Sequence, residues 1–402
     1  MKVREDKRDL EANIWKYFLY QFLSQWTLFL PFIIFYFLEI GYGLTQIMIF
    51  TAGMSLTVFV SEIPTGYIAD RIGRKGSIII SAVLLISSTS ILFFAESFFL
   101  LLLSYVLLGL SDAFVSGADS ALIYDTLLSK KREKEYKKIE GRAHFFAEMG
   151  VITSSLMGAA VITRGIKWTI AFSLVGYVIM FFVALSFKEP KIYNKIAPLP
   201  LKKELLSLGD ILKRSLKHKV LLGLFMYMFL VMGTSNVIFT IYQPYFSDAS
   251  IPLPWYGIIF AVMSVFTGLA ALKAHWVEEK LGVRGSLIMI PLILSLSLLG
   301  AGFFYAWYGV AFFFLREMVR GFVFPVLGDY THKIAKSEER ATVLSIGSMF
   351  SRVGYGLIAL AFGVFGDAFG LQPTLLWLGV MVGILFIGVI FFTRNIGAHT
   401  TS

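Results

Sequence analysis

The chain has 402 residues, of which 57% are hydrophobic and 16% aromatic, and its mean hydropathy is +0.75. This composition excludes an ordinary soluble domain and predicts an all-α protein buried in the lipid bilayer. The lack of cysteine excludes a disulfide framework, thiolate metal sites and cysteine nucleophiles. The net charge of +10 could indicate nucleic acid, but the basic residues follow the membrane pattern described below, so we expect no nucleic-acid partner.

Twelve apolar segments are each long enough to cross a bilayer as a helix. They cover residues 14–38, 44–70, 76–95, 98–127, 139–163, 167–187, 219–246, 253–279, 284–304, 307–332, 340–366 and 371–393. The stretch before the first segment carries charges of both signs and no cleavable-signal pattern, so the first span should remain in the mature protein. Lys and Arg gather in the connections on one side, and only Arg164 and Lys167 belong to the other, which predicts that both termini are cytoplasmic.

The connection between the second and third spans, residues 61–77, is short and basic. Gly66 would let another helix come close, and Gly73 would permit a tight reversal. Asp70 lies where the apolar helix meets water. Three basic residues favour the cytoplasmic face, namely Arg71, Arg74 and Lys75.

The pattern Gly66-x3-Asp70-Arg71-x-Gly73-Arg74-Lys75 resembles the corresponding loop of the major facilitator superfamily. The resemblance implies twelve transmembrane helices in two pseudo-symmetric six-helix bundles, which commonly work as a monomer by alternating access. It also implies an inner-gate latch, in which the carboxylate caps the eleventh helix and the second arginine pairs with an acid ending the fourth. The corresponding positions are Ser337 and Arg340 at the eleventh helix and Asp125 at the fourth. A basic turn that only sets topology is the alternative.

The longest connection, residues 188–218, divides the chain into bundles at 1–187 and 219–402. Its second part spaces leucines a helical turn apart between lysines, which predicts either an interfacial helix on the inner leaflet or a solvated linker helix.

An internal repeat supports the division into halves. Gly73-Arg-Lys-Gly-Ser before the third span recurs as Gly282-Val-Arg-Gly-Ser before the ninth. Gly363-x3-Asp367-x2-Gly370 is a third echo of the loop motif, at the outer end of the eleventh span, where we expect it to end a helix rather than to gate.

Polar and ionisable residues inside the spans are costly in lipid, so each is a candidate for the transport site. The resemblance implies that the first, fourth, seventh and tenth helices line the cavity. Spacings of four and three residues place Asp112, Ser116 and Asp119 on one face of the fourth span. In the tenth span, Glu317 could pair with Arg320. The other predicted cavity residues are Tyr20, Gln21, Gln25, Asn236, Gln243, Arg316, Arg320 and Arg352.

Four acids could carry a proton through the cycle, namely Asp112, Asp119, Glu62 and Glu148. A permanent ion pair is the alternative for Asp112 and Arg352, and the favoured one for Glu62. The fifth span contains Gly150-x3-Ser154-Ser155-x2-Gly158-Ala159, which is similar to a motif of efflux antiporters but lacks its proline. Small residues of this kind also serve tight helix packing.

These features favour proton-coupled export of small amphipathic organic compounds, similar to the drug:proton antiporter branch of the family. The expected partners are a small-molecule substrate, the proton and the bilayer of a prokaryotic plasma membrane, crossed many times. Uptake or exchange of an organic anion is the alternative, and a non-transporting sensor on the same fold is a third reading. An enzyme is not expected, nor a cofactor or metal, because no nucleophile with an oriented base and no metal-ligand spacing is visible.

Overall fold

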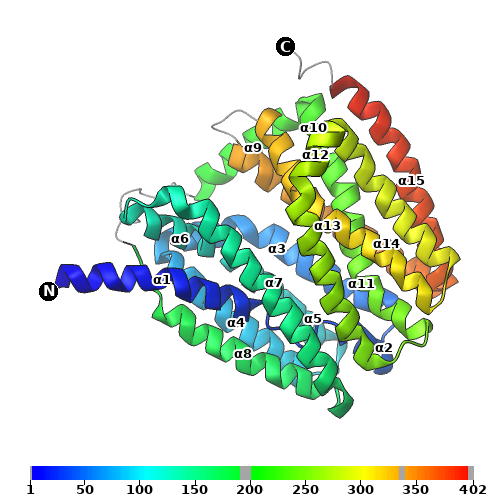
Figure 1. Ribbon diagram of the computed structural model, residues 1–402, viewed down its shortest axis with the longest axis horizontal. Helices are drawn as coiled ribbons and strands as arrows, with labels where there is room; N and C mark the ends of the chain where they lie inside the picture. The colour runs from blue at the N-terminus through cyan, green and yellow to red at the C-terminus, as the bar shows by residue number, and fades with distance from the viewer. Residues whose placement is uncertain (1, 191–200, 335–339, 397–402) are drawn as a thin grey trace. The chain divides into compact units, whose positions relative to one another are not determined.

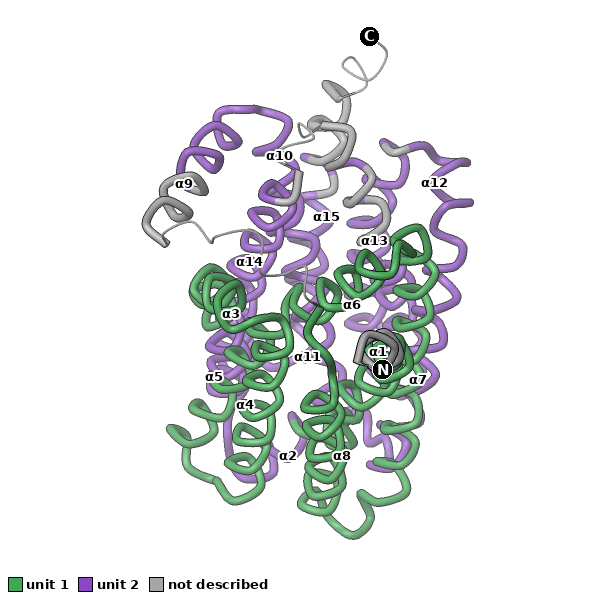
Figure 2. The backbone as a smooth tube through the Cα atoms, turned by 90° about the vertical axis from the view of Figure 1, so that its left-hand side faces the viewer, with its two compact units in different colours: residues 1–33, 56–204 green, residues 34–55, 205–402 purple. Residues whose placement is uncertain are grey.

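The computed structural model describes residues 2–190, 201–334 and 340–396, and all the regular elements within them are helices (Figure 1). The chain forms two compact units, residues 1–33 with 56–204 and residues 34–55 with 205–402 (Figure 2). The segment 34–55 therefore packs with the second unit although it lies near the start of the chain. The bundle boundaries predicted from the linker stay a prediction.

The first unit is built around α4, which packs against α5 and α8, while α1 packs against α7. Its helices are α1 (Lys2–Ser24), the later part of α3 (Leu44–Ile72), α4 (Arg74–Phe94), α5 (Phe98–Val115), α6 (Ala118–Ser129), η1 (Glu133–Glu135), α7 (Tyr136–Val161), η2 (Ile162–Arg164) and α8 (Ile166–Ser186). Small hydroxyl residues let α4 and α5 approach closely, with Ser81 and Ser111 Oγ atoms 3.0 Å apart.

The second unit is built around α12, which packs against α13 and α15. Its elements are α2 (Ile33–Glu39), the first part of α3, most of α9 (Leu201–Lys217), α10 (Lys219–Tyr227), the π-helix η4 (Met228–Met232), α11 (Gly233–Asp248), α12 (Leu253–Phe303), η5 (Trp307–Phe312), α13 (Phe313–Ile334), α14 (Arg340–Phe369) and α15 (Leu371–Ile396). The predicted linker helix is α9, and its position on a membrane surface stays a prediction.

The helices of the described chain can be assigned in order to the twelve predicted spans, and the predicted all-α membrane fold is confirmed. Nine helical stretches of the described chain are long and apolar enough to cross a bilayer, and Leu371–Leu385 is a shorter apolar helix. The first span consists of α1 and α2, and the tenth of η5 and α13.

The first span is broken where a continuous helix was predicted, because α1 ends at Ser24 and α2 begins at Ile33. Backbone groups freed by the break find partners on neighbouring helices. Ser173 Oγ accepts the N–H of Leu28 at 2.8 Å, and Ser154 Oγ donates to the carbonyl of Gln25 at 3.2 Å. Non-helical backbone at membrane depth requires this kind of compensation.

The fourth span is also broken, which corrects the expectation of one continuous polar face. Gly117 has a left-handed backbone with φ 74° and separates α5 from α6, while Ser116 lies in the break. Asp112 and Asp119 therefore belong to two different helices, and their sequence spacing does not place them on one face.

The repeated glycines occupy equivalent turns. Gly73 joins α3 to α4 with φ 90°, and Gly282 interrupts α12 with φ 66°. Both conformations favour glycine because a Cβ would be strained there. The repeat seen in the sequence is thus a repeat of backbone geometry.

Candidate functional site

In the loop of the predicted inner latch, the chain reverses at a single residue, Gly73, between α3 and α4. Asp70 at the end of α3 and Arg74 at the start of α4 form an ion pair, with Asp70 Oδ1 3.1 Å from Arg74 Nη1. Arg74 is also close enough to act electrostatically on Asp125 at the end of the fourth span. The Arg71 guanidinium lies over the ring of Tyr67, with 4.3 Å to its centroid.

Glu189 is a member of this loop that the sequence did not predict. Its carboxylate accepts the backbone N–H groups of Arg74 at 2.9 Å and Lys75 at 2.8 Å, and so caps the N-terminus of α4. A Cβ on Gly73 would lie 3.1 Å from the Glu189 carboxyl carbon. An acid directly after the sixth span is the one signal that could have suggested this cap.

The roles predicted for the remaining latch residues, Gly66, Ser337 and Arg340, are not established by the structure. A Cβ on Gly66 would meet no atom of the described chain within 4 Å, so the role of this glycine in helix packing stays a prediction. Ser337 lies outside the described residues, and the side chain of Arg340 is likewise outside what the structure describes. The pairing of Asp70 with the eleventh helix therefore stays a prediction.

Asp119 lies in the first turn of α6 and is held by neutral groups. Gln21 Nε2 donates to Oδ2 at 2.7 Å, and the N–H of Ser120 donates to Oδ1 at 2.7 Å. The nearby charge that acts on it is the Glu140 carboxylate, which accepts the hydroxyl of Tyr17 at 3.2 Å. No cation contacts Asp119 within the described chain. Because a cation usually accompanies an ionised group in lipid, this arrangement is exceptional.

The remaining predicted residues of the first unit lie on several helices. Tyr20 is buried in α1, and Gln25 lies in the break that follows it. Asp112 in α5, Glu62 in α3 and Glu148 in α7 are half-buried.

The efflux-like stretch of α7 packs against the first span. A Cβ on Gly150 would overlap the carbonyl oxygen of Phe22, and one on Gly158 would lie 2.5 Å from the carbonyl oxygen of Leu28. The small residues therefore serve close packing beside the break in the first span.

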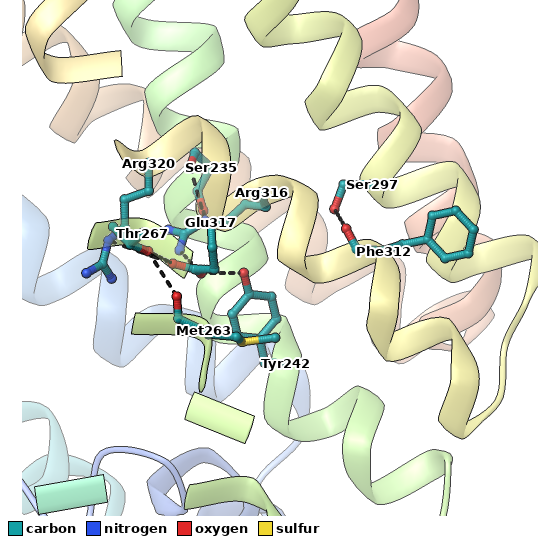
Figure 3. A network of polar contacts seen from close by, with 9 residues as sticks. All are labelled: Ser235, Tyr242, Met263, Thr267, Ser297, Phe312, Arg316, Glu317 and Arg320. Atoms are coloured by element: carbon teal, nitrogen blue, oxygen red, sulfur yellow. Dashed lines mark hydrogen bonds and ion pairs between the residues drawn. The ribbon is translucent and has the colours of Figure 1, made fainter. Parts of the chain in front are cut away.

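The tenth span carries a buried ion pair in the second unit (Figure 3). Arg316 and Glu317 are each 2% exposed, and Arg316 Nη1 lies 2.5 Å from Glu317 Oε1. Arg316 Nε also donates to the carbonyl of Ser235 at 2.9 Å and to its Oγ at 3.2 Å. Arg316 is thus neutralised by its neighbour in the chain.

Three further donors surround Glu317. Tyr242 OH donates to Oε1 at 2.8 Å, and Thr267 Oγ1 donates to Oε2 at 2.7 Å. The predicted pair with Arg320 is present, with Arg320 Nε 3.8 Å from Oε2. The network joins α11, α12 and α13. The sequence did not predict that Tyr242 and Thr267 bind Glu317, because their spacing in the chain does not indicate this contact.

The other predicted residues of the second unit have distinct surroundings. Gln243 is 2% exposed, and its Oε1 accepts the N–H groups of Ile34 at 2.7 Å and Phe35 at 3.2 Å, which caps α2. Asn236 is exposed, and Arg352 is half-buried in α14. Within the described chain, Arg352 Nε is buried and has no hydrogen-bond partner. The described residues also contain no group of three or more His, Asp or Glu that could hold a metal ion.

Comparison with known proteins points to one family. A model of the Major Facilitator Superfamily matches residues 17–250. An uncharacterized MFS-type transporter of Bacillus subtilis (strain 168), YxaM, is 23% identical over an alignment of 388 residues that covers 91% of each chain.

Solved structures share the fold at low identity. The nucleoside transporter NupG has a TM-score of 0.77 at 13% identity, over 97% of this chain and 99% of its own. A bacterial homologue of the human lysosomal transporter Spinster, inward-facing and unoccupied, has a TM-score of 0.75 at 16% identity, over 97% of both chains. A POT family transporter in complex with 5-aminolevulinic acid has a TM-score of 0.74 at 14% identity, over 97% and 96%.

Proposed function

The chain belongs to the Major Facilitator Superfamily and is a multi-pass membrane transporter of that fold, and we propose that it exports small amphipathic organic compounds in exchange for protons. Alternating access to a site between the membrane faces is the mechanism that this fold supports. The proposal includes a monomer in a prokaryotic plasma membrane, with both termini in the cytoplasm.

Asp119 carries the proposal of proton coupling. Its hydrogen-bond donors are an amide and a backbone N–H, whereas Glu317 in the other unit is held by two arginines. A carboxyl group without a cationic partner can gain and lose a proton without breaking an ion pair. Asp119 is therefore better suited to coupling than Glu317, whose buried pair favours a permanent structural role.

The surroundings of Asp119 support an amphipathic substrate. Tyr17 and Tyr20 of α1 belong to the same packed cluster as the apolar residues of α6. An acid beside aromatic rings suits organic cations and compounds that are partly apolar. The fold itself is no guide to the substrate, because its solved members include transporters described for nucleosides and for peptides.

Transport of an organic anion is a second candidate, favoured by Arg352. Its buried Nε has no hydrogen-bond partner among the described residues, so this guanidinium retains donor capacity inside a span. Arg316, by contrast, forms an ion pair with Glu317 and therefore does not support transport of an organic anion.

Purified protein in liposomes with an imposed pH gradient tests the proposal. The probes are a fluorescent lipophilic cation and a fluorescent carboxylate, and the variants are Asp119→Asn and, as a control, Glu96→Gln, which removes an exposed acid of the same unit. We expect gradient-driven flux of the cation that Asp119→Asn uncouples and Glu96→Gln leaves intact. A flux of the cation that does not depend on the pH gradient would contradict proton coupling.

The same assay separates the alternatives. Flux of the carboxylate alone, lost in Arg352→Gln, would establish the anion carrier instead. Binding of a probe without flux would establish a sensor.

A further inference from the structure

Residues 34–55 are a segment of the first half of the chain that packs within the second unit (Figure 2). The segment contains most of α2, the turn after it and the first part of α3. α2 begins one residue before the segment, at Ile33, and α3 begins within it, at Leu44, so the N–H groups of two helix N-termini need acceptors here. Both acceptors come from helices of the second half.

Asp367 of α14 caps the start of α3. Its Oδ1 accepts the N–H of Leu44 at 2.8 Å, and its Oδ2 accepts the N–H of Thr45 at 2.9 Å. A Cβ on Gly43 would lie 3.0 Å from the same carboxylate, so the turn fits closely around it. A carboxylate at this place is stabilised by the positive end of the helix dipole.

Two glycines of α14 allow this contact. A Cβ on Gly363 would lie 2.8 Å from Thr45 Cα and 3.1 Å from the Leu44 carbonyl oxygen, so the two backbones touch. A Cβ on Gly366 would lie 2.6 Å from Leu44 Cδ1. The sequence motif that contains Gly363, Asp367 and Gly370 was expected to end a helix. Only Gly370 has that role, with φ 84°, whereas Gly363 and Asp367 contact the start of α3.

Two more contacts hold the segment. Gln243 of α11 caps α2 through the N–H groups of Ile34 and Phe35. Ser55 Oγ donates to the carbonyl of Arg352 in α14 at 3.0 Å. Each of these bonds involves a backbone group that water can satisfy equally well, so the contacts can open and close reversibly.

We propose that Asp367 and Gln243 form an outer latch, which holds residues 34–55 on α11 and α14 and releases them when the transporter opens to the outside. The latch lies at the side of the membrane where the connections between spans contain few basic residues. The charge pattern predicts that this side faces the outside of the cell. It depends on alternating access alone, and neither on the proton nor on the substrate class.

Disulfide cross-linking tests whether the segment docks as described. The chain has no cysteine, so introduced thiols react without background. A Cβ on Gly366 would lie 3.7 Å from Leu44 Cβ, within the range of roughly 3.5–4.5 Å that disulfides require. We expect the full-length double variant Leu44→Cys with Gly366→Cys to cross-link on mild oxidation in membranes, with the bond identified by mass spectrometry. Absence of this bond would overturn the docking.

The same pair measures the contribution of the cap. Adding Asp367→Ala, which removes both acceptor oxygens, should slow cross-linking by roughly fivefold, the effect of losing a helix cap. Adding Glu39→Gln, which removes an exposed acid of the same segment, should leave the rate unchanged. Equal rates with and without Asp367→Ala would overturn the latch.

A labelling measurement covers the case in which that variant does not fold. Met48 is fully buried and its Cγ would lie 3.1 Å from a Cβ on Gly363, so Met48→Cys reports on the docked surface. We expect slow reaction with a membrane-impermeant maleimide in intact cells, accelerated by Asp367→Ala or Gln243→Leu and unaffected by Glu39→Gln. Labelling that neither variant changes would overturn the proposal. Neither measurement uses a substrate or a pH gradient, so its failure is separate from failure of the proposed function.

Discussion

Asp119 and Glu317 are carboxylates inside membrane spans with opposite surroundings. Asp119 is held by an amide and a backbone N–H, while Glu317 is bonded by Arg316, Tyr242 and Thr267. The first can change its protonation without losing an ion pair. The second is part of the packing between three helices, and its loss should appear as lost stability.

Breaking the Arg316–Glu317 pair should therefore destabilise the protein strongly. Glu317→Gln alone leaves the 2%-exposed Arg316 without its counter-charge, which typically costs about 3–5 kcal/mol. Arg316→Met should cost less, because Arg320 Nε still lies 3.8 Å from the Glu317 carboxylate. The double variant Arg316→Met with Glu317→Leu should recover part of that loss. Thermal unfolding of the purified protein measures both effects.

The matched control is Lys167→Met, which breaks an exposed pair with Glu96 at 3.7 Å and should cost at most about 1 kcal/mol. Single variants of the buried pair that behave like this control would refute its structural role.

Glu11 gives a prediction about pH. Hydrogen bonds from Lys130 at 2.6 Å and Arg132 at 2.7 Å hold the pKa of its carboxyl below the ordinary value of 4.5. A group with a lowered folded pKa stabilises the fold above its unfolded pKa and loses that contribution as pH falls through the folded pKa. Since Glu11 is 58% exposed, screening keeps the contribution well under about 1 kcal/mol.

Glu11→Gln should thus lower the unfolding temperature slightly at pH 7, and the difference should vanish well below pH 4.5. Unfolding curves across this pH range provide the measurement. A difference that persisted in acid would mean that the side chain acts through packing instead of charge.

At the scale of elements, several spans of the described chain depart from a regular α-helix. The first is broken between α1 and α2, the fourth at Gly117, and the seventh contains the π-helix η4. Irregular turns of this kind are frequent at functional sites. In each case the break is compensated by polar partners or by close packing of a neighbouring helix.

The π-helix crosses α14 with the two backbones in contact. A Cβ on Gly354 would overlap the carbonyl oxygen of Phe229 and lie 2.7 Å from its carbon. Gly354→Ala should therefore destabilise the protein by about 1–3 kcal/mol, as overpacking does. Thermal unfolding checks the prediction.

Gly268→Ala is the control, because a Cβ at this helical glycine would meet no atom within 4 Å. It should be neutral or stabilise by up to about 1 kcal/mol, the difference in helix propensity. Equal effects of the two substitutions would show that the crossing tolerates a wider separation.

At the scale of the whole molecule, the charge distribution predicts the orientation of every connection. Thr163 lies beside Arg164 at the proposed outer face, and Ser129 precedes a basic connection at the proposed inner face, and both are exposed. Thr163→Cys should react with an impermeant maleimide in intact cells, and Ser129→Cys only after permeabilisation. The reverse pattern would place both termini outside.

The sequence by itself determined the class of protein, the twelve spans, the reversal at Gly73 and the repeated turn at Gly282. These follow from local properties, since hydropathy over twenty residues and the backbone freedom of one glycine need no knowledge of neighbours. One left-handed glycine, Gly117, breaks the helix between Asp112 and Asp119, so their helical spacing could not decide how the two carboxylates lie.

Tertiary structure alone decided which charges are paired and where residues 34–55 dock. The Glu189 cap on α4 joins positions 115 residues apart, and the Asp367 cap on α3 joins positions 323 apart. In lipid a buried charge or a helix terminus must find a partner, but any of several polar residues can supply it. The choice among them is made by the packing of distant helices, which no local pattern in the chain encodes.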